Sequence, residues 1–346
     1  MDSFPAYFPR FLWHGRFTED NAGHKWLISS GSGVKFRAYQ TSCRVWIRNA
    51  AIPGEYNYIS MVVDGHHYPR IPISFDTLTP LDIPFKTASE YHDVEIYKET
   101  EASCGFIVIS SFEGVGEGMG DFPYSSGKKI EFIGDSFTAG MSADTSLVPC
   151  DEGRWYDQHN AYDSYGPRVA RAMDLNYMIS AVSGMGVYRN WNSDTPTFVD
   201  VYESTFLANQ PDDPAWNFES FPADIVTILL GTNDLSEGDG ITPRQPFDAA
   251  QFITRYVELI KKIHYHYPQA DIVMLQVTTP EIDKRNALQK CHEEIKIKAE
   301  AEIPGLRPIS LFTFSPLTLD GCGDHPSLEE HEKMANELIP VIKKLL

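Results

Sequence analysis

The sequence predicts two domains of different class, a β-sandwich followed by an α/β/α three-layer domain built on a parallel sheet. Its 346 residues are enough for two domains of ordinary size. Up to about residue 125, short alternating segments are separated by turn signals. From residue 128 onward, apolar strand patterns alternate with long helical patterns. We therefore place the two domains at residues 1–122 and 123–346.

The first domain is predicted to consist almost entirely of strands. Polar and apolar residues alternate at 43–48 and 93–98, as in half-buried strands, and 58–63 is apolar enough for a buried strand. The dipeptide Asp64-Gly65 fits a type I′ hairpin turn. Many short strands with Gly and Pro turns favour a sandwich of the jelly-roll type. The glycine-rich stretch 114–127 fits a linker to the second domain.

Strands and helices are expected to alternate in the second domain. A last helix should begin after Ser327, because Glu330 three residues later completes a capping box. Such alternation predicts a parallel sheet with helices on both faces. The remaining elements are expected as strands at 130–133, 177–182, 225–230 and 271–277, and as helices at about 161–173, 247–267 and 281–302.

The negative charge of the chain argues against two kinds of partner, nucleic acids and anionic membranes. Lys and Arg total 29 against 48 Asp and Glu, which gives a formal net charge of −19. Nucleic acids and anionic membranes are bound through basic patches, and the densest basic clusters here are only Lys261-Lys262 and Lys343-Lys344. We expect neither partner. A neutral sugar or ester fits the charge, although the same charge could serve solubility alone.

The cysteines and the N-terminus carry little functional signal. Five scattered cysteines without a CxxC pair predict neither a disulfide framework nor a zinc site, and Cys322-x-x-His325 has no second pair to complete it. We expect no metal and no cofactor. Without a visible leader or an apolar run of 18 residues, the sequence predicts a cytoplasmic protein, although a secreted one whose leader has been removed would look the same. The oligomeric state stays open.

Four short blocks lie next to predicted strands or helices of the second domain. Functional residues of open α/β sheets collect at the carboxyl ends of strands. Gly134-Asp135-Ser136 follows the first strand and can present Ser136 as a nucleophile, although alone it could be a helix N-cap. Gly184, in Ser183-Gly184-Met185-Gly186, can point a backbone N–H into a site or simply form a tight turn.

The other two blocks supply an amide and an imidazole. Asn233 follows the strand at 225–230, and its side-chain amide can donate to an oxyanion without carrying charge, although an Asx-turn is the plainer interpretation. His325 lies in the loop 320–327 before the last helix and can act as the base for a serine, or as a structural loop histidine.

Taken together, Ser, Gly, Asn and His in this order resemble the SGNH hydrolases, also called the GDSL esterase/lipase superfamily. That resemblance covers about 128–346. With a β-sandwich ahead of it, the chain resembles carbohydrate esterase family 2 over nearly its full length, including the stretches 130–136, 188–190 and 230–234. The resemblance implies that acetylated plant polysaccharides or oligosaccharides, of the xylan or mannan type, are deacetylated through a serine nucleophile.

The resemblance also implies a role for each block. Ser136 attacks the acetyl carbonyl, and His325 takes its proton and returns it to the leaving sugar hydroxyl. The backbone N–H groups of Ser136 and Gly184 and the amide of Asn233 form the oxyanion hole. Tyr188 and Trp191 follow the Gly184 block and can stack on sugar rings, or fill space between the domains.

One position departs from the superfamily pattern. Most SGNH enzymes carry Asp three residues before the histidine, whereas this chain has Cys322 there. A backbone carbonyl near Cys322 can orient His325 and give a Ser–His dyad, as is frequent in family 2. Asp320 remains an alternative if its loop curls. Two rival functions stay open: a catalytically weak carbohydrate-binding protein, and an SGNH esterase or lipase that acts on a non-carbohydrate ester.

Overall fold

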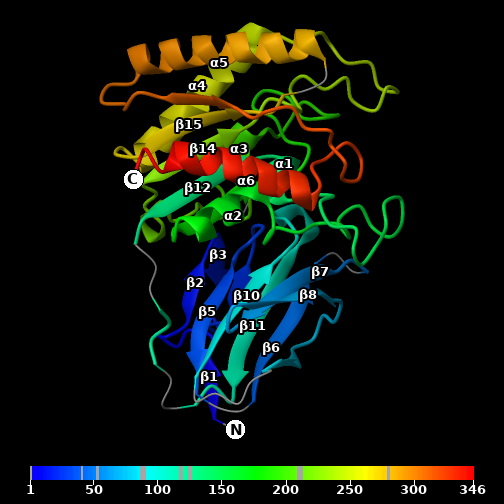
Figure 1. Ribbon diagram of the computed structural model, residues 1–346, viewed down its shortest axis with the longest axis vertical. Coiled ribbons are helices and arrows are strands. Elements are labelled where there is room, and N and C mark those ends of the chain that lie inside the picture. The colour runs from blue at the N-terminus through cyan, green and yellow to red at the C-terminus, as the bar shows by residue number, and fades with distance from the viewer. Residues whose placement is uncertain are drawn as a thin grey trace.

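Two antiparallel sheets face each other in the first part of the chain and form a β-sandwich. The computed structural model describes residues 2–39, 42–51, 54–85, 91–116, 120–123, 127–208, 213–278 and 281–346. One sheet has the order β3-β4-β11-β6-β9, with β1 also paired to β11, and the other has the order β2-β5-β10-β7-β8. Figure 1 shows the sandwich, coloured blue to cyan, below the second domain.

The strands of the sandwich are short, as the sequence predicts. The first sheet contains β1 (Ser3–Pro5), β3 (Phe17–Glu19), β4 (Lys25–Leu27), β6 (Cys43–Ala50), β9 (Thr79–Ile83) and β11 (Phe106–Glu113). The second sheet contains β2 (Leu12–His14), β5 (Gly33–Ala38), β7 (Asn57–Val63), β8 (His66–Ile73) and β10 (His92–Lys98).

Alternation and turn chemistry explain these strands. Buried and partly exposed residues alternate along all of β6, so one face of this strand enters the core between the sheets. That core includes Phe36, Ile47, Ile96 and Phe112, all fully buried. Asp64 and Gly65 join β7 to β8 with φ angles of 51° and 75°, which are the left-handed conformations that a type I′ turn requires.

A five-stranded parallel sheet forms the middle layer of the second domain. Its order is β13-β12-β14-β15-β16, and every neighbouring pair is parallel. The predicted fold class is therefore confirmed. The strands are β12 (Lys129–Gly134), β13 (Asn176–Ala181), β14 (Ile225–Leu229), β15 (Asp271–Gln276) and β16 (Ser310–Thr313). The sequence patterns predicted the first four of these and missed β16.

Helices cover both faces of this sheet. On one face α4 and α5 pack together and contribute Phe252, Ile260 and Ile295 to a core cluster, while α2 and α6 pack on the other face. Ser327 and Glu330 form the expected capping box at the start of α6. The helices are α1 (Ser136–Ala139), α2 (Tyr165–Ala172), α3 (Phe198–Val201), α4 (Ala249–His266), α5 (Ile282–Glu302) and α6 (Leu328–Ile342), with 3₁₀ turns η1 (Ala102–Cys104) and η2 (Phe218–Ser220).

Buried polar contacts join the two domains. Arg16, from the sandwich, is fully buried and donates to the carbonyl of Tyr202 and the hydroxyl of Ser180, and its guanidinium lies 3.9 Å from Glu131. β11 ends at Glu113 and β12 begins at Lys129. The predicted linker and the boundary at residue 122 fall between them, and 117–119 and 124–126 lie outside the described residues.

Candidate active site

The four blocks meet at one edge of the parallel sheet. Asp135 and Ser136 follow β12, Gly184 follows β13 and Asn233 follows β14, each just beyond the carboxyl end of its strand. His325 reaches the same edge from the loop before α6. Because neighbouring parallel strands end at one edge, four short segments far apart in the sequence converge on a single site.

The local backbone presents Ser136 at the first residue of α1. Asp135 caps this helix, and its Oδ1 accepts a hydrogen bond from the Phe137 N–H at 3.2 Å. Gly134 is required where the strand turns into the helix, because a Cβ there would lie 2.0 Å from Thr138 Oγ1. Burial raises the pKa of Asp135 to about 7, and the nearby charge of Asp234 acts in the same direction.

Ser136 and His325 form a hydrogen-bonded pair. The Oγ of Ser136 lies 2.9 Å from the Nε2 of His325. The other ring nitrogen, Nδ1, lies 2.7 Å from the Gly323 carbonyl oxygen and 3.2 Å from that of Cys322. If Nδ1 carries the proton that these carbonyls accept, Nε2 is the free acceptor for the serine proton. The pair therefore has the geometry of a nucleophile and its base.

Backbone carbonyls, not a carboxylate, orient the imidazole. The Asp320 carboxylate instead accepts a hydrogen bond from Thr318 Oγ1 at 2.6 Å. Burial lowers the pKa of His325, whereas the hydrogen bonds to Gly323 and Cys322 act in the opposite direction. The net effect is a lower pKa for His325. The ring therefore stays neutral, and able to accept a proton, at pH values below the ordinary titration range of histidine.

The three predicted oxyanion donors follow the neighbouring strands β13, β12 and β14. Gly184 has a φ of +78°, a left-handed conformation that glycine adopts without strain. In the described part of the chain, the backbone N–H groups of Ser136 and Gly184 have no acceptor. Asn233 differs, because its Nδ2 lies 3.0 Å from both Asp135 Oδ2 and the Met185 carbonyl. To donate to an oxyanion, the Asn233 amide must share or exchange one of these hydrogen bonds.

Asp234 organises the loop that carries Gly184. Its buried carboxylate accepts hydrogen bonds from the backbone N–H groups of Val187, Tyr188 and Arg189, and the Arg189 Nε donates to the Asp234 carbonyl at 2.7 Å. Burial raises the pKa of Asp234 to about 6, although these N–H groups oppose the rise. The residue after Asn233 thus fixes the loop after Gly184.

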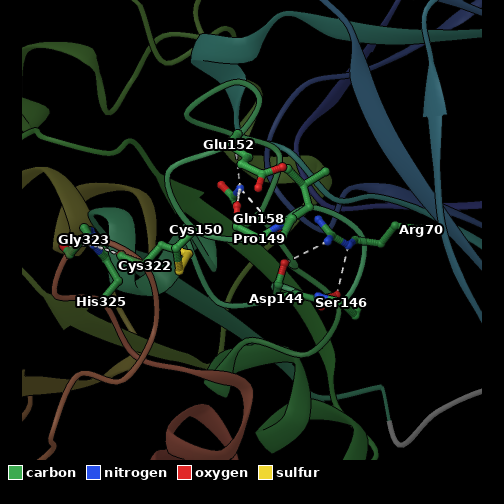
Figure 2. The surroundings of a disulfide bond; sticks show 11 residues. Arg70, Asp144, Ser146, Pro149, Cys150, Glu152, Gln158, Cys322, Gly323 and His325 are labelled. Atoms are coloured by element: carbon green, nitrogen blue, oxygen red, sulfur yellow. Dashed lines mark hydrogen bonds and ion pairs between the residues drawn. A yellow bond between two sulfur atoms is a disulfide. The ribbon is translucent and has the colours of Figure 1, made fainter.

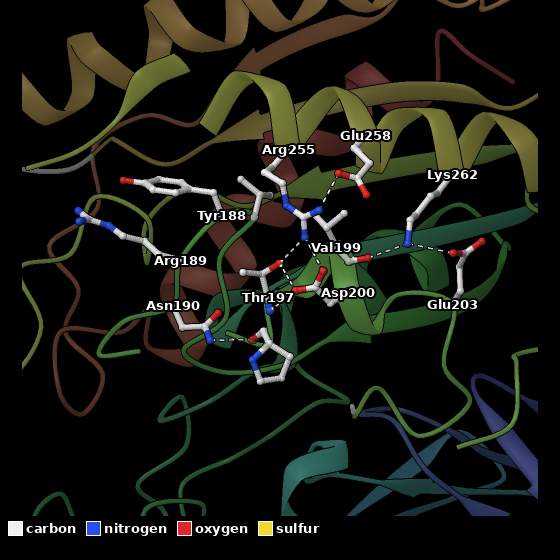
Figure 3. Close-up of polar contacts among 12 residues, drawn as sticks. Tyr188, Arg189, Asn190, Thr197, Val199, Asp200, Glu203, Arg255, Glu258 and Lys262 are labelled. Atoms are coloured by element: carbon white, nitrogen blue, oxygen red, sulfur yellow. Dashed lines mark hydrogen bonds and ion pairs between the residues drawn. The ribbon is translucent and has the colours of Figure 1, made fainter. Parts of the chain in front are cut away.

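The end of this loop is anchored on α4. Figure 3 shows Arg255, on α4, directed toward Thr197 and Asp200. Two turns further along, Lys262 donates to the Val199 carbonyl and pairs with Glu203 at 2.9 Å. These contacts hold the segment between the Gly184 block and β14 against the helix layer.

The carboxylate of Glu101, in the sandwich, also contacts the Gly184 block. Glu101 is fully buried, and the backbone N–H of Ser183 lies 3.1 and 3.2 Å from its two oxygens. The Ser183 hydroxyl also donates to Glu101, and His159 Nε2 lies 3.5 Å away. Sequence patterns gave no sign of Glu101, because Ser183 and His159 lie in the other domain.

A cavity of about 490 Å³ opens in front of Ser136 and His325. Trp191 lines it, with 48% of its surface exposed. Tyr188, the other predicted substrate-binding residue, lies outside this cavity. Its ring packs against Phe247 and Phe252, and its hydroxyl accepts a hydrogen bond from the Asp248 N–H. This placement favours a packing role for Tyr188.

One expectation about the cysteines is wrong. Cys150 and Cys322 form a disulfide across 172 residues of sequence, whereas Cys43, Cys104 and Cys291 are free and buried. The sequence pattern could not reveal the pair, because scattered cysteines do not show which of them meet in space.

The described residues contain neither a metal-binding cluster nor a membrane-spanning helix. No group of three or more His, Cys, Asp or Glu side chains there is arranged to hold a metal ion. Within the same residues, no helix is both long and apolar enough to cross a membrane.

Two family models match this chain in succession. Residues 13–119 match the carbohydrate esterase 2 N-terminal family, and residues 132–302 match the GDSL-like lipase/acylhydrolase family. The first match falls on the sandwich, and the second covers Ser136, Gly184 and Asn233.

Similar proteins extend the likeness to nearly the whole chain. The cellulase/esterase CelE of Acetivibrio thermocellus is 28% identical over 98% of this chain, which spans only 40% of that protein. An acetylxylan esterase/glucomannan deacetylase of Cellvibrio japonicus is 28% identical over 82% of this chain and 77% of its own length.

A solved structure has the same arrangement of both domains. It is a family two carbohydrate esterase from Clostridium thermocellum in complex with cellohexaose, with a TM-score of 0.83 and 26% identity over 96% of this chain and 98% of that one. Together, the two successive family matches and this full-length likeness show that the chain belongs to carbohydrate esterase family 2, with a GDSL-like hydrolase domain behind its N-terminal sandwich.

Proposed function

We propose that this protein is a carbohydrate O-acetylesterase that removes acetyl groups from acetylated xylan or mannan, or from their oligosaccharides. The observation that carries the proposal is the hydrogen bond of 2.9 Å between Ser136 Oγ and His325 Nε2. Among the residues that the structure describes, the backbone N–H groups of Ser136 and Gly184 have no acceptor and are open to an oxyanion. A serine paired with a neutral imidazole and facing such donors is suited to acyl transfer.

The first half of the reaction forms an acetyl-enzyme. Ser136 Oγ attacks the acetyl carbonyl carbon while its proton passes to His325 Nε2. The oxyanion receives hydrogen bonds from the N–H groups of Ser136 and Gly184 and from the Asn233 amide. Collapse of this intermediate breaks the bond to the sugar oxygen, which takes the proton back from His325 and leaves as a hydroxyl.

The second half releases acetate. Water gives a proton to His325 and attacks the acetyl-enzyme, and the same donors hold the second oxyanion. Its collapse returns the proton to Ser136 and frees acetic acid, which ionises at neutral pH. No step needs a cofactor, because the serine, the imidazole and the fixed donors perform each bond change.

The substrate class is supported by the cavity and by the relatives. Trp191 is partly exposed and lines the same cavity as Ser136, and aromatic rings favour the apolar faces of sugars. The net charge of −19 suits a neutral ester better than an anionic one. One similar protein is named an acetylxylan esterase/glucomannan deacetylase, and one similar structure contains cellohexaose.

Acetate release from acetylated xylan and glucomannan oligosaccharides tests the proposal. We expect the wild-type protein to release acetate and Ser136→Ala to lose nearly all activity. Ser220→Ala, on η2 and away from the site, is the matched control and should remain active. Binding of the glycans without turnover of them or of p-nitrophenyl acetate would favour a carbohydrate-binding protein. Turnover of non-carbohydrate esters alone would favour a different esterase.

The cellular location also remains a proposal. The sequence predicts a cytoplasmic protein, but the Cys150–Cys322 disulfide favours an oxidising compartment, where such bonds persist. Fractionation of the native host, followed by detection of the protein, distinguishes the two.

A further inference from the structure

The disulfide lies directly beside the imidazole of the proposed catalytic pair. Cys322 precedes His325 by three residues, and its carbonyl oxygen is one of the two acceptors near Nδ1. Figure 2 shows Cys150 bonded to Cys322, with Gly323 and His325 next to them. The position that usually supplies a carboxylate in SGNH enzymes thus supplies a backbone carbonyl and a cross-link instead.

The loop around His325 holds the ring only through its backbone. Gly323 and Asp324 both have φ angles of 59°, so two successive residues are left-handed and turn the chain sharply. The Gly321 N–H donates to the His325 carbonyl at 2.8 Å, which closes the loop. A carboxylate can follow an imidazole by rotating its side chain, but a carbonyl acceptor moves only with the chain. The position of Nδ1 therefore depends on the position of this loop.

Two contacts of Cys322 tie the loop to a distant segment of the chain. The backbone N–H of Cys322 donates to the carbonyl of Ser142 at 3.0 Å, and the Cys322 sulfur bonds to Cys150. Both contacts lead to the segment 142–160, which follows α1. This segment thus fixes the part of the loop that carries one of the carbonyls near Nδ1.

That segment is in turn held by the sandwich. The guanidinium of Arg70, on β8, donates to the carbonyls of Asp144 and Asp157 at 3.0 and 2.9 Å and lies 3.0 Å from the Asp144 carboxylate. Gln158 Nε2 donates to the carbonyls of Pro149 and Glu152, on either side of Cys150 (Figure 2). Cys150 is therefore a well-held anchor for the loop of His325.

We propose that the Cys150–Cys322 disulfide is a positioning element for His325, which holds its two carbonyl acceptors in place and links them to the sandwich through Arg70. The proposal rests on the proposed function, because it assigns His325 as the base. Reduction by dithiothreitol would add two electrons and two protons to the S–S bond. It yields two thiols and the cyclic disulfide of the reagent, and frees the loop at Cys322.

Counting thiols tests whether the bond exists. The protein is denatured without reductant, alkylated with iodoacetamide and weighed by mass spectrometry. Three of the five cysteines should react, since Cys43, Cys104 and Cys291 are free. Five reactive cysteines would overturn the proposal.

Kinetics test the positioning role. In Cys150→Ala/Cys322→Ala, we expect kcat per active site to fall roughly 10- to 100-fold, because small misplacements of a catalytic group have effects of this size. KM for p-nitrophenyl acetate should change little. Active sites are counted by fluorophosphonate labelling of Ser136, so a loss of folded protein lowers the count and not kcat per site. Cys43→Ala, in the sandwich, removes a buried thiol and is the matched control.

A second measurement covers the case in which the double variant does not fold. Wild-type protein is reduced by dithiothreitol under native conditions, and the rate of Ser136 labelling is followed. The rate should fall on reduction and recover on reoxidation. An unchanged rate in protein shown to be reduced would overturn the proposal, as would no labelling of the oxidised protein. Normal labelling with no release of acetate from glycans would overturn the proposed function alone.

Discussion

The buried carboxylate of Glu101 accepts hydrogen bonds from the backbone N–H of Ser183, the residue before Gly184. The nitrogen lies 3.1 and 3.2 Å from the two carboxylate oxygens. Glu101 belongs to the sandwich, at the residue that precedes η1, whereas Ser183 follows β13 of the second domain. A residue of the N-terminal domain thus fixes the backbone that presents the Gly184 N–H.

This contact predicts that Glu101→Gln slows catalysis without weakening substrate binding. The amide keeps the size of the side chain but lacks the charge and one acceptor for the Ser183 N–H and hydroxyl. Loss of a whole oxyanion donor costs about 10²–10³ in rate. We expect a smaller loss, roughly tenfold in kcat, because the Gly184 N–H is displaced and not removed. Steady-state kinetics per labelled Ser136 measure it, with the exposed Glu19→Gln as the control. An unchanged kcat would show that Glu101 serves packing alone.

The fold could be predicted because its signals are local. The alternation along β6 and the capping box at Ser327 each lie within a few residues of sequence. β16 was missed because Ser310–Thr313 is only four residues long, too short to show a clear period. The disulfide was missed because its two cysteines are 172 residues apart and nothing local pairs them.

The candidate site likewise contains residues with a local sequence signal and residues that act from a distant part of the chain. Ser136, Gly184 and Asn233 could be proposed from sequence, since each follows a strand and the ends of parallel strands meet. The residues that hold them in place were not predicted. Glu101 and Arg70 act from the other domain, and only the packing of the two domains brings them to the site. Tyr188 and Trp191 both follow Gly184 within seven residues, yet Trp191 lines the cavity and Tyr188 does not.

The environment of His325 predicts activity that persists into mildly acidic solution. Burial lowers the pKa of the imidazole, and the neighbouring His159 adds to this effect, while the carbonyls of Gly323 and Cys322 and the charge of Asp324 oppose it. His331 also interacts with the ring. The base must be neutral, so activity is lost as the pH falls through this pKa. The acid limb of kcat/KM, which reports the free enzyme, should therefore have its midpoint below the ordinary histidine value of about 6.5.

Asp324→Asn provides a directional control for this profile. The carboxylate of Asp324 raises the pKa of His325, so its removal should move the acid limb to still lower pH. Asparagine tolerates the left-handed φ of 59° at this position. A wild-type midpoint at or above 6.5, or an acid limb that moves upward in the variant, would contradict the assigned electrostatics.

Glu99 predicts a loss of stability as the pH rises. Its buried carboxyl accepts hydrogen bonds from the Ser60 hydroxyl and, at 2.9 Å, from the Tyr162 N–H across the domain interface. Burial raises its pKa from 4.5 to about 7, although both hydrogen bonds oppose the rise. Between these pH values the folded protein holds a proton that the unfolded chain has lost. The free energy of unfolding therefore decreases with rising pH, by on the order of 3 kcal/mol for this group.

Urea unfolding at pH 5 and pH 8 measures this contribution. Glu99→Gln cannot titrate, so between pH 5 and pH 8 it should gain on the order of 3 kcal/mol relative to wild type. Ser60→Ala should lose more stability than wild type between pH 5 and pH 8. The substitution removes a hydrogen bond that stabilises the charged carboxylate of Glu99, so the free energy of unfolding falls more steeply as the pH rises. If wild type and Glu99→Gln lose stability in parallel, the carboxyl is already ionised at pH 5 in the folded protein. Burial would then not dominate its titration.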